Sequence, residues 1–143
     1  MFGLFSKNDQ KRPLATILVI EDSEGDRALI RRTLEKKNYS VISANDGESG
    51  LKIVRERKVD AIILDYLLPG MNGLEVCRIL KEDKRTRNIP TIFLTVVESG
   101  EAILECYGSG AESYMHKPID AKTLLVEVKS ILSEAKENGG EDQ

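Results

Sequence analysis

The sequence is poor in the residues that several common kinds of site require. It contains two cysteines, Cys77 and Cys106, with no Cys-x-x-Cys pair, and a single histidine, His116. A metal site built from histidine and cysteine ligands is therefore excluded. Widely separated cysteines are typical of reduced side chains in a cytosolic protein, so we expect a cytoplasmic location and no disulfide.

Long apolar runs and an excess of basic residues are also missing. No apolar stretch approaches the length of a membrane-spanning helix. The 21 lysines and arginines are outnumbered by 24 aspartates and glutamates, so direct nucleic-acid binding is not expected. The chain has 143 residues, of which 41% are hydrophobic, and this suits one domain with its own core. We place that domain at residues 14–135.

The two ends of the chain are predicted to lie outside this domain. Residues 1–13, "MFGLFSKNDQKRP", contain Phe2, Leu4 and Phe5 but no signal-peptide core. They are interpreted either as an N-terminal tail or as a short apolar docking peptide. The last residues, "ENGGEDQ", indicate a disordered acidic tail over residues 136–143.

Short apolar strands alternate with amphipathic segments along the domain. Strands are predicted at 16–21, 40–44, 61–65, 90–95 and 112–116, and helices at 47–57 and 98–108. Three more helices have start signals, namely Ser23 with Asp26, Asn72 with Glu75, and Asp120 with Thr123. Five such units predict an α/β fold, a doubly wound parallel sheet with helices on both faces.

In a fold of this kind, functional residues lie at the carboxyl ends of the strands. The first strand ends at Glu21 and Asp22, the third at Asp65 and the fourth at Thr95, and Lys117 follows the fifth. Each of these residues, taken alone, is ordinary in a loop. Because all of them belong to the same edge of one sheet, we expect their side chains to share one crevice.

This set of side chains suits phosphoryl transfer. Three carboxylates held close together repel one another unless a cation lies among them. Mg²⁺ takes oxygen ligands and favours one or two carboxylates together with a phosphate. An aspartate such as Asp65 can act as a nucleophile and carry a phosphoryl group, and Lys117 and Thr95 would contact its oxygens.

The same residues resemble a known family. Glu21-Asp22, "LDYLLPGMNG" around Asp65, "FLT" ending at Thr95 and "GAESYMHKP" over 110–118 are similar to motifs of the receiver domain of bacterial two-component response regulators. The resemblance covers roughly residues 14–135 and points to the stand-alone type similar to the chemotaxis response regulator. It implies a flavodoxin-like (βα)5 fold with strand order 2-1-3-4-5.

The resemblance also implies roles for individual residues. Asp65 would accept a phosphoryl group from a phosphohistidine on a histidine kinase or a histidine phosphotransfer protein. Lys117 and Thr95 would hold the phosphoryl group, and the chain would catalyse only its own phosphorylation and dephosphorylation. The implied ligands of Mg²⁺ are Glu21, Asp22, Asp65 and the backbone carbonyl of Leu67.

A conformational switch is implied as well. Thr95 would move towards the phosphoryl group, Tyr114 would turn inward, and the Lys117–Pro118 peptide bond would be cis. The face formed by the fourth helix, fifth strand and fifth helix would then bind a separate, unidentified downstream protein. The chain would be a monomer or a phosphorylation-dependent dimer.

Several residues depart from the common pattern of the family. Val96 follows Thr95 where a small residue is usual, and Ile119 follows Pro118 where Phe is frequent. Leu67 and Val97 are apolar at positions beside the path of the hydrolytic water. We hypothesise that Val96, Leu67 and Val97 crowd the site and make the aspartyl-phosphate long-lived.

Three other functions are alternatives to this one. A haloacid-dehalogenase-type phosphatase would need a second aspartate at position 67, which is Leu67. A flavin-binding electron carrier would need a phosphate-binding loop after the first strand, and the acidic "EDSEGDRA" would repel a phosphate. The alternative that stays open is a receiver-like docking module that acts without phosphate.

Overall fold

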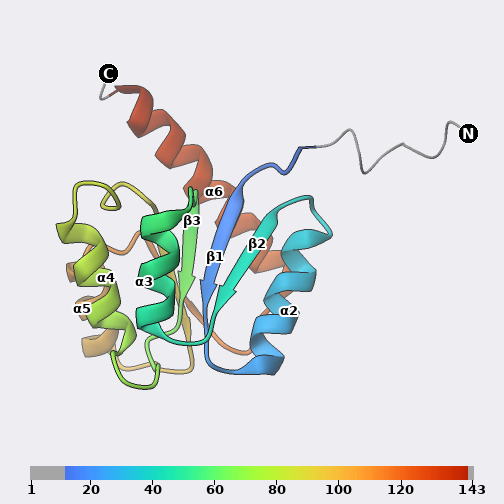
Figure 1. The fold of residues 1–143 in the computed structure, drawn as a ribbon. Helices are drawn as coiled ribbons and strands as arrows, with labels where there is room; N and C mark the ends of the chain where they lie inside the picture. The colour runs from blue at the N-terminus through green and yellow to red at the C-terminus, as the bar shows by residue number, and fades with distance from the viewer. Residues whose placement is uncertain (1–11, 142–143) are drawn as a thin grey trace, which may run out of the picture.

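A five-stranded parallel sheet forms the centre of the protein, with helices on both of its faces (Figure 1). The structure is a computed structural model that describes residues 12–141, with side chains described up to Asn138. The strands are β1 (Thr16–Ile20), β2 (Ser40–Ala44), β3 (Ala61–Leu64), β4 (Thr91–Thr95) and β5 (Ser113–His116). The helices are α2 (Glu24–Glu35), α3 (Gly47–Glu56), α4 (Gly73–Glu82), α5 (Gly100–Gly108) and α6 (Ala121–Glu141).

The strands lie in the order β2-β1-β3-β4-β5, which confirms the predicted fold and strand order. Ile17 of β1, for example, pairs with Val41 of β2 on one side and with Ala61 of β3 on the other. The chain therefore reverses its direction across the sheet at β1 and β3. The connections that leave these two strands lead to opposite faces, and the carboxyl ends of β1 and β3 lie side by side.

Alternate residues of the strands build two separate hydrophobic cores. On one face, Leu18 and Ile62 pack with Leu51 of α3, Val76 of α4 and Cys106 of α5. On the other face the core comprises Ile17, Val19, Ile63 and Leu94 of the sheet, Ile30 and Leu34 of α2, and Leu124, Val128 and Ile131 of α6. Burial on both faces explains why the strands are almost continuously apolar.

The predicted helix starts are confirmed by their capping hydrogen bonds. The side chain of Ser23 accepts from the backbone N–H of Asp26, and Asn72 and Glu75 form a complete capping box. Asp120 accepts from the backbone N–H of Thr123 at 3.0 Å. These side chains satisfy N–H groups that have no partner within a helix.

The C-terminal end differs from the sequence prediction. Disorder was predicted from residue 136, but α6 continues to Glu141, so that prediction was wrong for residues 136–141. Ala135, Lys136 and Glu137 are strong helix formers, and they prolong a helix that the apolar stripe has already anchored to the sheet. Within residues 12–141, no helix has both the length and the apolar character that crossing a membrane requires.

The predicted N-terminal tail falls largely outside the described part of the chain. Residues 1–11 and 142–143 are not described, so the choice between an N-terminal tail and a docking peptide stays a prediction. Cys77 and Cys106 are both buried and both free, in agreement with the expectation of reduced cysteines.

The loop from Asp65 to α4 is shaped by two glycines. Gly70 has a φ of 72°, in the left-handed region that favours glycine. Gly73 starts α4 in direct contact with the end of β3, where a Cβ atom would lie 2.1 Å from the carbonyl oxygen of Asp65. Gly73 therefore allows α4 to begin immediately beside Asp65.

We expect Gly73→Ala to lower the free energy of unfolding by about 2–4 kcal/mol, because the added Cβ meets backbone atoms that must shift. Gly25→Ala is the matched control, since a Cβ at Gly25, in the first turn of α2, meets nothing within 4 Å. That control should be neutral or should gain about 0.5–1 kcal/mol. Urea unfolding measures both values, and equal effects of the two substitutions would contradict the contact at Gly73.

Candidate functional site

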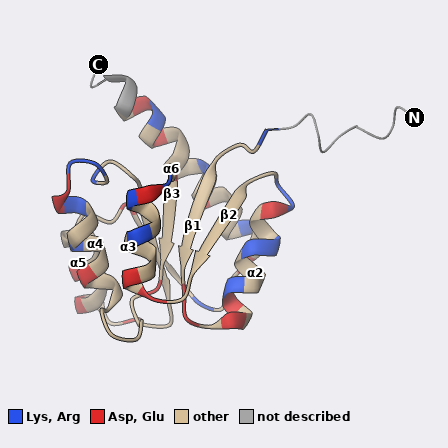
Figure 2. Ribbon diagram, in the orientation of Figure 1, with Lys and Arg blue, Asp and Glu red and all other residues tan. Residues whose placement is uncertain are grey.

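Three carboxylates meet at the carboxyl edge of the sheet, as the sequence predicted. Glu21 and Asp22 follow β1 and Asp65 follows β3, and one oxygen from each lies within 4.8 Å of the others. Glu21 and Asp65 are only 2% and 5% exposed, whereas Asp22 is exposed. Figure 2 shows acidic residues gathered at this lower edge, where the arrows of the strands end. We call Glu21, Asp22 and Asp65 the acidic cluster.

Lys117 reaches into the acidic cluster from the end of β5. Its Nζ atom lies 2.7 Å from Glu21 Oε1 and 2.9 Å from Asp65 Oδ2. A third carboxylate, Asp26 of α2, lies 2.8 Å from the same nitrogen. The Lys117 side chain is only 10% exposed, so these contacts are formed largely away from water.

Asp26 is the site residue that sequence reasoning missed. It was recognised only as the partner of Ser23 in a helix-start signal. Asp26 lies in the first turn of the helix that follows Glu21 and Asp22, and this position could have indicated that it lies near the acidic cluster. Nothing in the order of residues, however, shows that Lys117, far along the chain, approaches that turn.

Burial and charge alter the proton affinities of two of these groups. Burial raises the pKa of Glu21 to about 7, although hydrogen bonds from Lys117 and Ser23 oppose the rise. Burial alone would lower the pKa of Lys117, but its hydrogen bonds to Asp26, Glu21 and Asp65 outweigh that cost and leave it raised. Lys117 is therefore fully protonated and carries one positive charge among the carboxylates.

Backbone groups hold the two buried carboxylates in place. The backbone N–H of Ser23 donates to Glu21 Oε2 at 3.0 Å, and Arg27 donates to the backbone carbonyl of Glu21 at 2.7 Å. The backbone N–H of Leu67 donates to Asp65 Oδ1 at 3.1 Å. Both oxygens of Asp65 are therefore hydrogen-bonded, one to Leu67 and one to Lys117. The predicted role of the Leu67 carbonyl as a metal ligand stays a prediction.

Thr95 and Tyr114 meet at the backbone of Val97. Thr95 is completely buried at the end of β4, and its hydroxyl accepts from the backbone N–H of Val97 at 3.4 Å. The Tyr114 hydroxyl donates to the carbonyl of Val97, and its half-buried ring lies 6.5 Å from the ring of Phe93. The backbone N–H of Lys117 donates to the carbonyl of Thr95 at 2.9 Å. Residue 97 thus connects the predicted switch pair.

The cis-proline position and the residues that depart from the family pattern can also be located in the structure. The Lys117–Pro118 peptide bond is cis, as expected. Leu67 and Val96 are 51% and 57% exposed, and Val97 is half-buried. Ile119 packs at the edge of the core that α2 and α6 cover. The proposed effect of Val96, Leu67 and Val97 on hydrolysis stays a prediction.

The residues present fit a magnesium ion. The acidic cluster offers three carboxylate oxygens within 4.8 Å of one another, and Mg²⁺ prefers oxygen ligands. The negative charge of these carboxylates exceeds the one positive charge of Lys117. The raised pKa of Glu21 shows that its ionised form is poorly compensated, which a divalent cation would correct.

The chain is similar to a known protein family and to individual proteins of that family. The response regulator receiver domain family matches residues 17–129. Protein PilH of Pseudomonas aeruginosa is 32% identical over 84% of this chain and 99% of its own length. The transcriptional regulatory protein AfsQ1 of Streptomyces coelicolor is 34% identical, but this chain spans only 52% of it. The chain thus spans about half the length of some curated relatives and nearly all of another.

Solved structures agree with the family match. A putative response regulator from Chloroflexus aurantiacus superposes with a TM-score of 0.81 at 30% identity, covering 85% of this chain and 99% of that one. The chemotaxis protein CheY4 of Vibrio cholerae gives a TM-score of 0.78 at 29% identity, over 82% of this chain and 98% of that one. The acidic cluster, the lysine beside it and the matches over most of the chain lead to one conclusion: this protein belongs to the response regulator receiver domain family of two-component signalling systems.

Proposed function

We propose that the protein is a phosphoacceptor switch in which Asp65 takes a phosphoryl group from a phosphohistidine. The observation that carries this proposal is the pairing of Asp65 Oδ2 with Lys117 Nζ at 2.9 Å, within a cluster of three carboxylates. The donor would be a histidine kinase or a histidine phosphotransfer protein. The chemistry would be confined to the protein's own aspartate.

The proposed reaction exchanges one bond to phosphorus for another. A carboxylate oxygen of Asp65 forms the new P–O bond, and the P–N bond of the phosphohistidine breaks with its electron pair passing to the imidazole nitrogen. That nitrogen takes up a proton from solvent. Lys117 neutralises charge on the transferring group, and the Leu67 N–H holds the carboxylate in position.

Mg²⁺ is the proposed cofactor, held by Glu21, Asp22, Asp65 and the carbonyl of Leu67. When bound, it would supply positive charge to the phosphoryl oxygens. The carboxylates of Glu21 and Asp22 position that charge beside Asp65. Ionisation of Glu21 is required for it to act as a ligand, and its pKa of about 7 lies close to neutral pH.

Phosphorylation would be transmitted through residue 97. A phosphoryl group on Asp65 gives the Thr95 hydroxyl an acceptor for its proton, and movement of the hydroxyl towards that group would lengthen the bond that it accepts from the Val97 N–H. The position of the loop after β4 would then change, and with it the carbonyl that Tyr114 binds. This is a shift between two populated arrangements, in which the phosphoryl group favours one.

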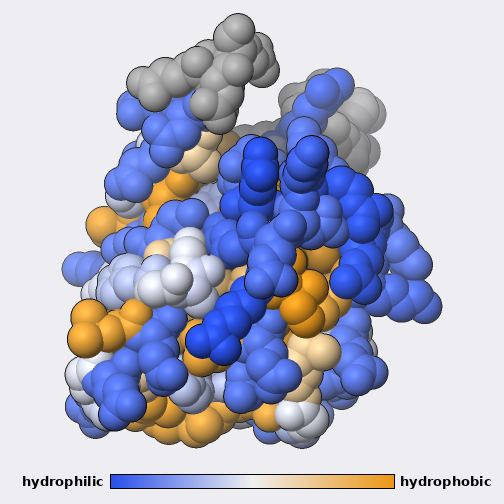
Figure 3. Space-filling view, turned by 90° about the vertical axis from the view of Figure 1, so that its left-hand side faces the viewer, coloured by the Kyte–Doolittle hydropathy of each residue, from blue (hydrophilic) through white to orange (hydrophobic). Residues whose placement is uncertain are grey.

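The proposed output surface is the face of α5, β5 and α6. The two helices that border this face carry exposed apolar side chains, among them Leu104 and Tyr107 on α5 and Val126 on α6, which are 73%, 47% and 68% exposed. Figure 3, which looks onto the side of α4 and α5, shows hydrophobic areas interspersed with hydrophilic residues. Such a mixed surface suits a reversible contact with a separate downstream protein.

Incubation with Mg²⁺ and a phosphorylated histidine kinase tests the proposed function. We expect the intact mass of the wild type to rise by one phosphoryl group, because Asp65 is a buried carboxylate whose oxygens are held by the Lys117 ammonium and the Leu67 N–H. Asp65→Asn should gain nothing, and Asp60→Asn, at the start of β3, should gain the group as the wild type does. No gain in the wild type with several kinases and acetyl phosphate would favour the phosphate-independent docking module.

The lifetime of the phosphorylated form tests the effect of the apolar residues near Asp65. We expect Val96→Ala to hydrolyse about fivefold faster than the wild type, equivalent to roughly 1 kcal/mol in the barrier, because a smaller side chain admits water more freely. Val126→Ala removes the same atoms from exposed α6 and should leave the rate unchanged. A half-life of seconds for purified wild-type protein would contradict the hypothesis.

The raised pKa of Glu21 predicts a specific pH dependence of stability without metal. With a pKa of about 7 in the folded state and about 4.5 in the unfolded state, Glu21 binds more proton in the folded protein between these values. The free energy of unfolding should therefore fall as pH rises from 4.5 to above 7, by up to about 3 kcal/mol from this group.

Urea unfolding in EDTA at pH 5 and pH 8 measures this fall. Glu21→Gln should lose less stability between the two pH values than the wild type does, because it lacks the ionisable group. Glu48→Gln, which removes an exposed carboxylate at the start of α3, should behave as the wild type. An identical fall in Glu21→Gln and the wild type would show that burial does not raise this pKa.

A further inference from the structure

We infer that Asp26 is a positioning residue that sets the magnesium affinity of the acidic cluster by holding the Lys117 ammonium. The inference rests on the proposed magnesium site and adds to it a residue outside the expected ligands. Asp26 belongs to α2, and its carboxylate lies 2.8 Å from Lys117 Nζ. The group that faces Asp26 at the carboxyl edge is therefore the ammonium of Lys117, which is a cation and not a metal ligand.

Three carboxylates surround the ammonium of Lys117. Glu21 lies at 2.7 Å, Asp26 at 2.8 Å and Asp65 at 2.9 Å from the nitrogen. The contact with Asp65 is a hydrogen bond, and the contacts with Glu21 and Asp26 are close ion pairs. Two of these partners, Glu21 and Asp65, belong to the acidic cluster, and Asp26 does not.

Lys117 and a divalent cation would therefore compete for the same two carboxylates. When Glu21 and Asp65 turn their charge to Mg²⁺, the ammonium loses part of its compensation at a site where it is only 10% exposed. Asp26 is the partner that it retains. Because Asp26 still compensates the ammonium, it lowers the free-energy cost of moving Glu21 and Asp65 from Lys117 to the metal.

Asp26 is itself held firmly at the start of α2. Its backbone N–H donates to the side chain of Ser23 at 3.2 Å. The next residue, Arg27, donates to the backbone carbonyl of Glu21 at 2.7 Å, which ties the first turn of α2 to the end of β1. A carboxylate in the first turn of a helix is also favoured by the helix dipole. The position of Asp26 relative to Lys117 is thus fixed by the fold.

Loss of the Asp26 charge would weaken metal binding through two effects, both of which raise the dissociation constant. The ammonium would turn more strongly to Glu21 and Asp65, so Mg²⁺ would have to displace a tighter ion pair. The site would also lose one negative charge near the metal. Both effects raise the dissociation constant for Mg²⁺.

Titration of the full chain with MgCl₂, followed by calorimetry and by backbone amide NMR shifts, tests this role. We expect Asp26→Asn to raise the dissociation constant about threefold to tenfold. Asp26→Glu, which restores the carboxylate, should recover most of the affinity. Asp26→Ser, whose side chain is too short to hold the ammonium, is a second variant with the same expectation as Asp26→Asn.

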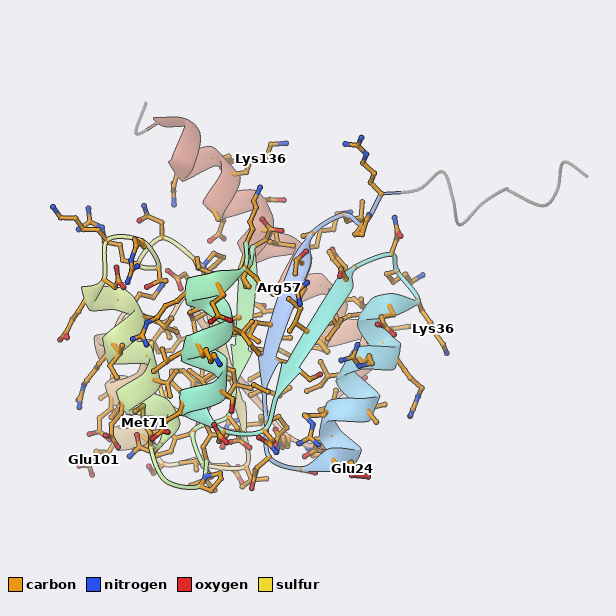
Figure 4. The ribbon with its side chains drawn as sticks, viewed as in Figure 1. Glu24, Lys36, Arg57, Met71, Glu101 and Lys136 are labelled. Carbon is orange, nitrogen blue, oxygen red and sulfur yellow. The ribbon has the colours of Figure 1, made fainter. Side chains whose placement is uncertain are left out.

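Glu24→Gln is the matched control for charge alone. Glu24 lies in the same first turn of α2, and Figure 4 labels it at the lower end of that helix. Among the residues that the structure describes, no ion pair involves Glu24. We expect this variant to bind Mg²⁺ nearly as tightly as the wild type. An equal loss in Glu24→Gln and Asp26→Asn would reduce the effect to general charge and overturn the inference.

A double-mutant cycle with Lys117→Met shows whether Asp26 acts through the ammonium. In the Lys117→Met background, Asp26→Asn should keep only the part of its effect that comes from the lost negative charge, so the change in the dissociation constant should be clearly smaller than in the wild-type background. An undiminished effect in that background would overturn the inference, and so would wild-type affinity in Asp26→Asn. Absence of saturable Mg²⁺ binding by the wild type would overturn the proposed metal site and this inference together, whereas the other outcomes leave the metal site intact.

Discussion

The ammonium of Lys117 is the point on which the arrangement at the carboxyl edge depends. Glu21 and Asp65 are almost completely buried, and buried carboxylates so close together would be unstable without a compensating cation. Lys117 supplies that charge from β5, at the opposite side of the sheet from β2. Burial raises the pKa of Glu21 to about 7 despite the contact with Lys117, so the ammonium offsets only part of the cost of burying that carboxylate.

The surrounding structure serves to bring these charges together. The reversal of chain direction between β1 and β3 places Glu21 and Asp65 side by side, and Gly73 lets α4 start in contact with the Asp65 carbonyl. The first turn of α2 adds Asp26 and, through Arg27, holds the Glu21 backbone. The same loops therefore fix the positions of these carboxylates relative to one another.

A second connection leads away from the site through Val97. The N–H of Val97 donates to the Thr95 hydroxyl, and the carbonyl of Val97 accepts from the Tyr114 hydroxyl. The backbone of this one residue therefore contacts both side chains. Thr95 is also joined to Lys117 through the backbone. Asp65 is thus connected to β5 and β4 through Lys117, and the proposed switch would use this connection.

The sequence by itself determined the alternation of strands and helices, the helix caps and the identity of Glu21, Asp22, Asp65, Thr95 and Lys117 as strand-end residues. These features are local, since hydrophobic periodicity and capping depend on near neighbours in the chain. The polar composition of the C-terminal residues predicted disorder, but the anchored helix before them continues to Glu141. The contact of Asp26 with Lys117 and the full burial of Glu21 were decided only by the tertiary structure. These features depend on residues at the end of β1, at the start of α2 and after β5. Because these segments are far apart in the chain, the sequence does not show that their side chains approach one another and exclude water.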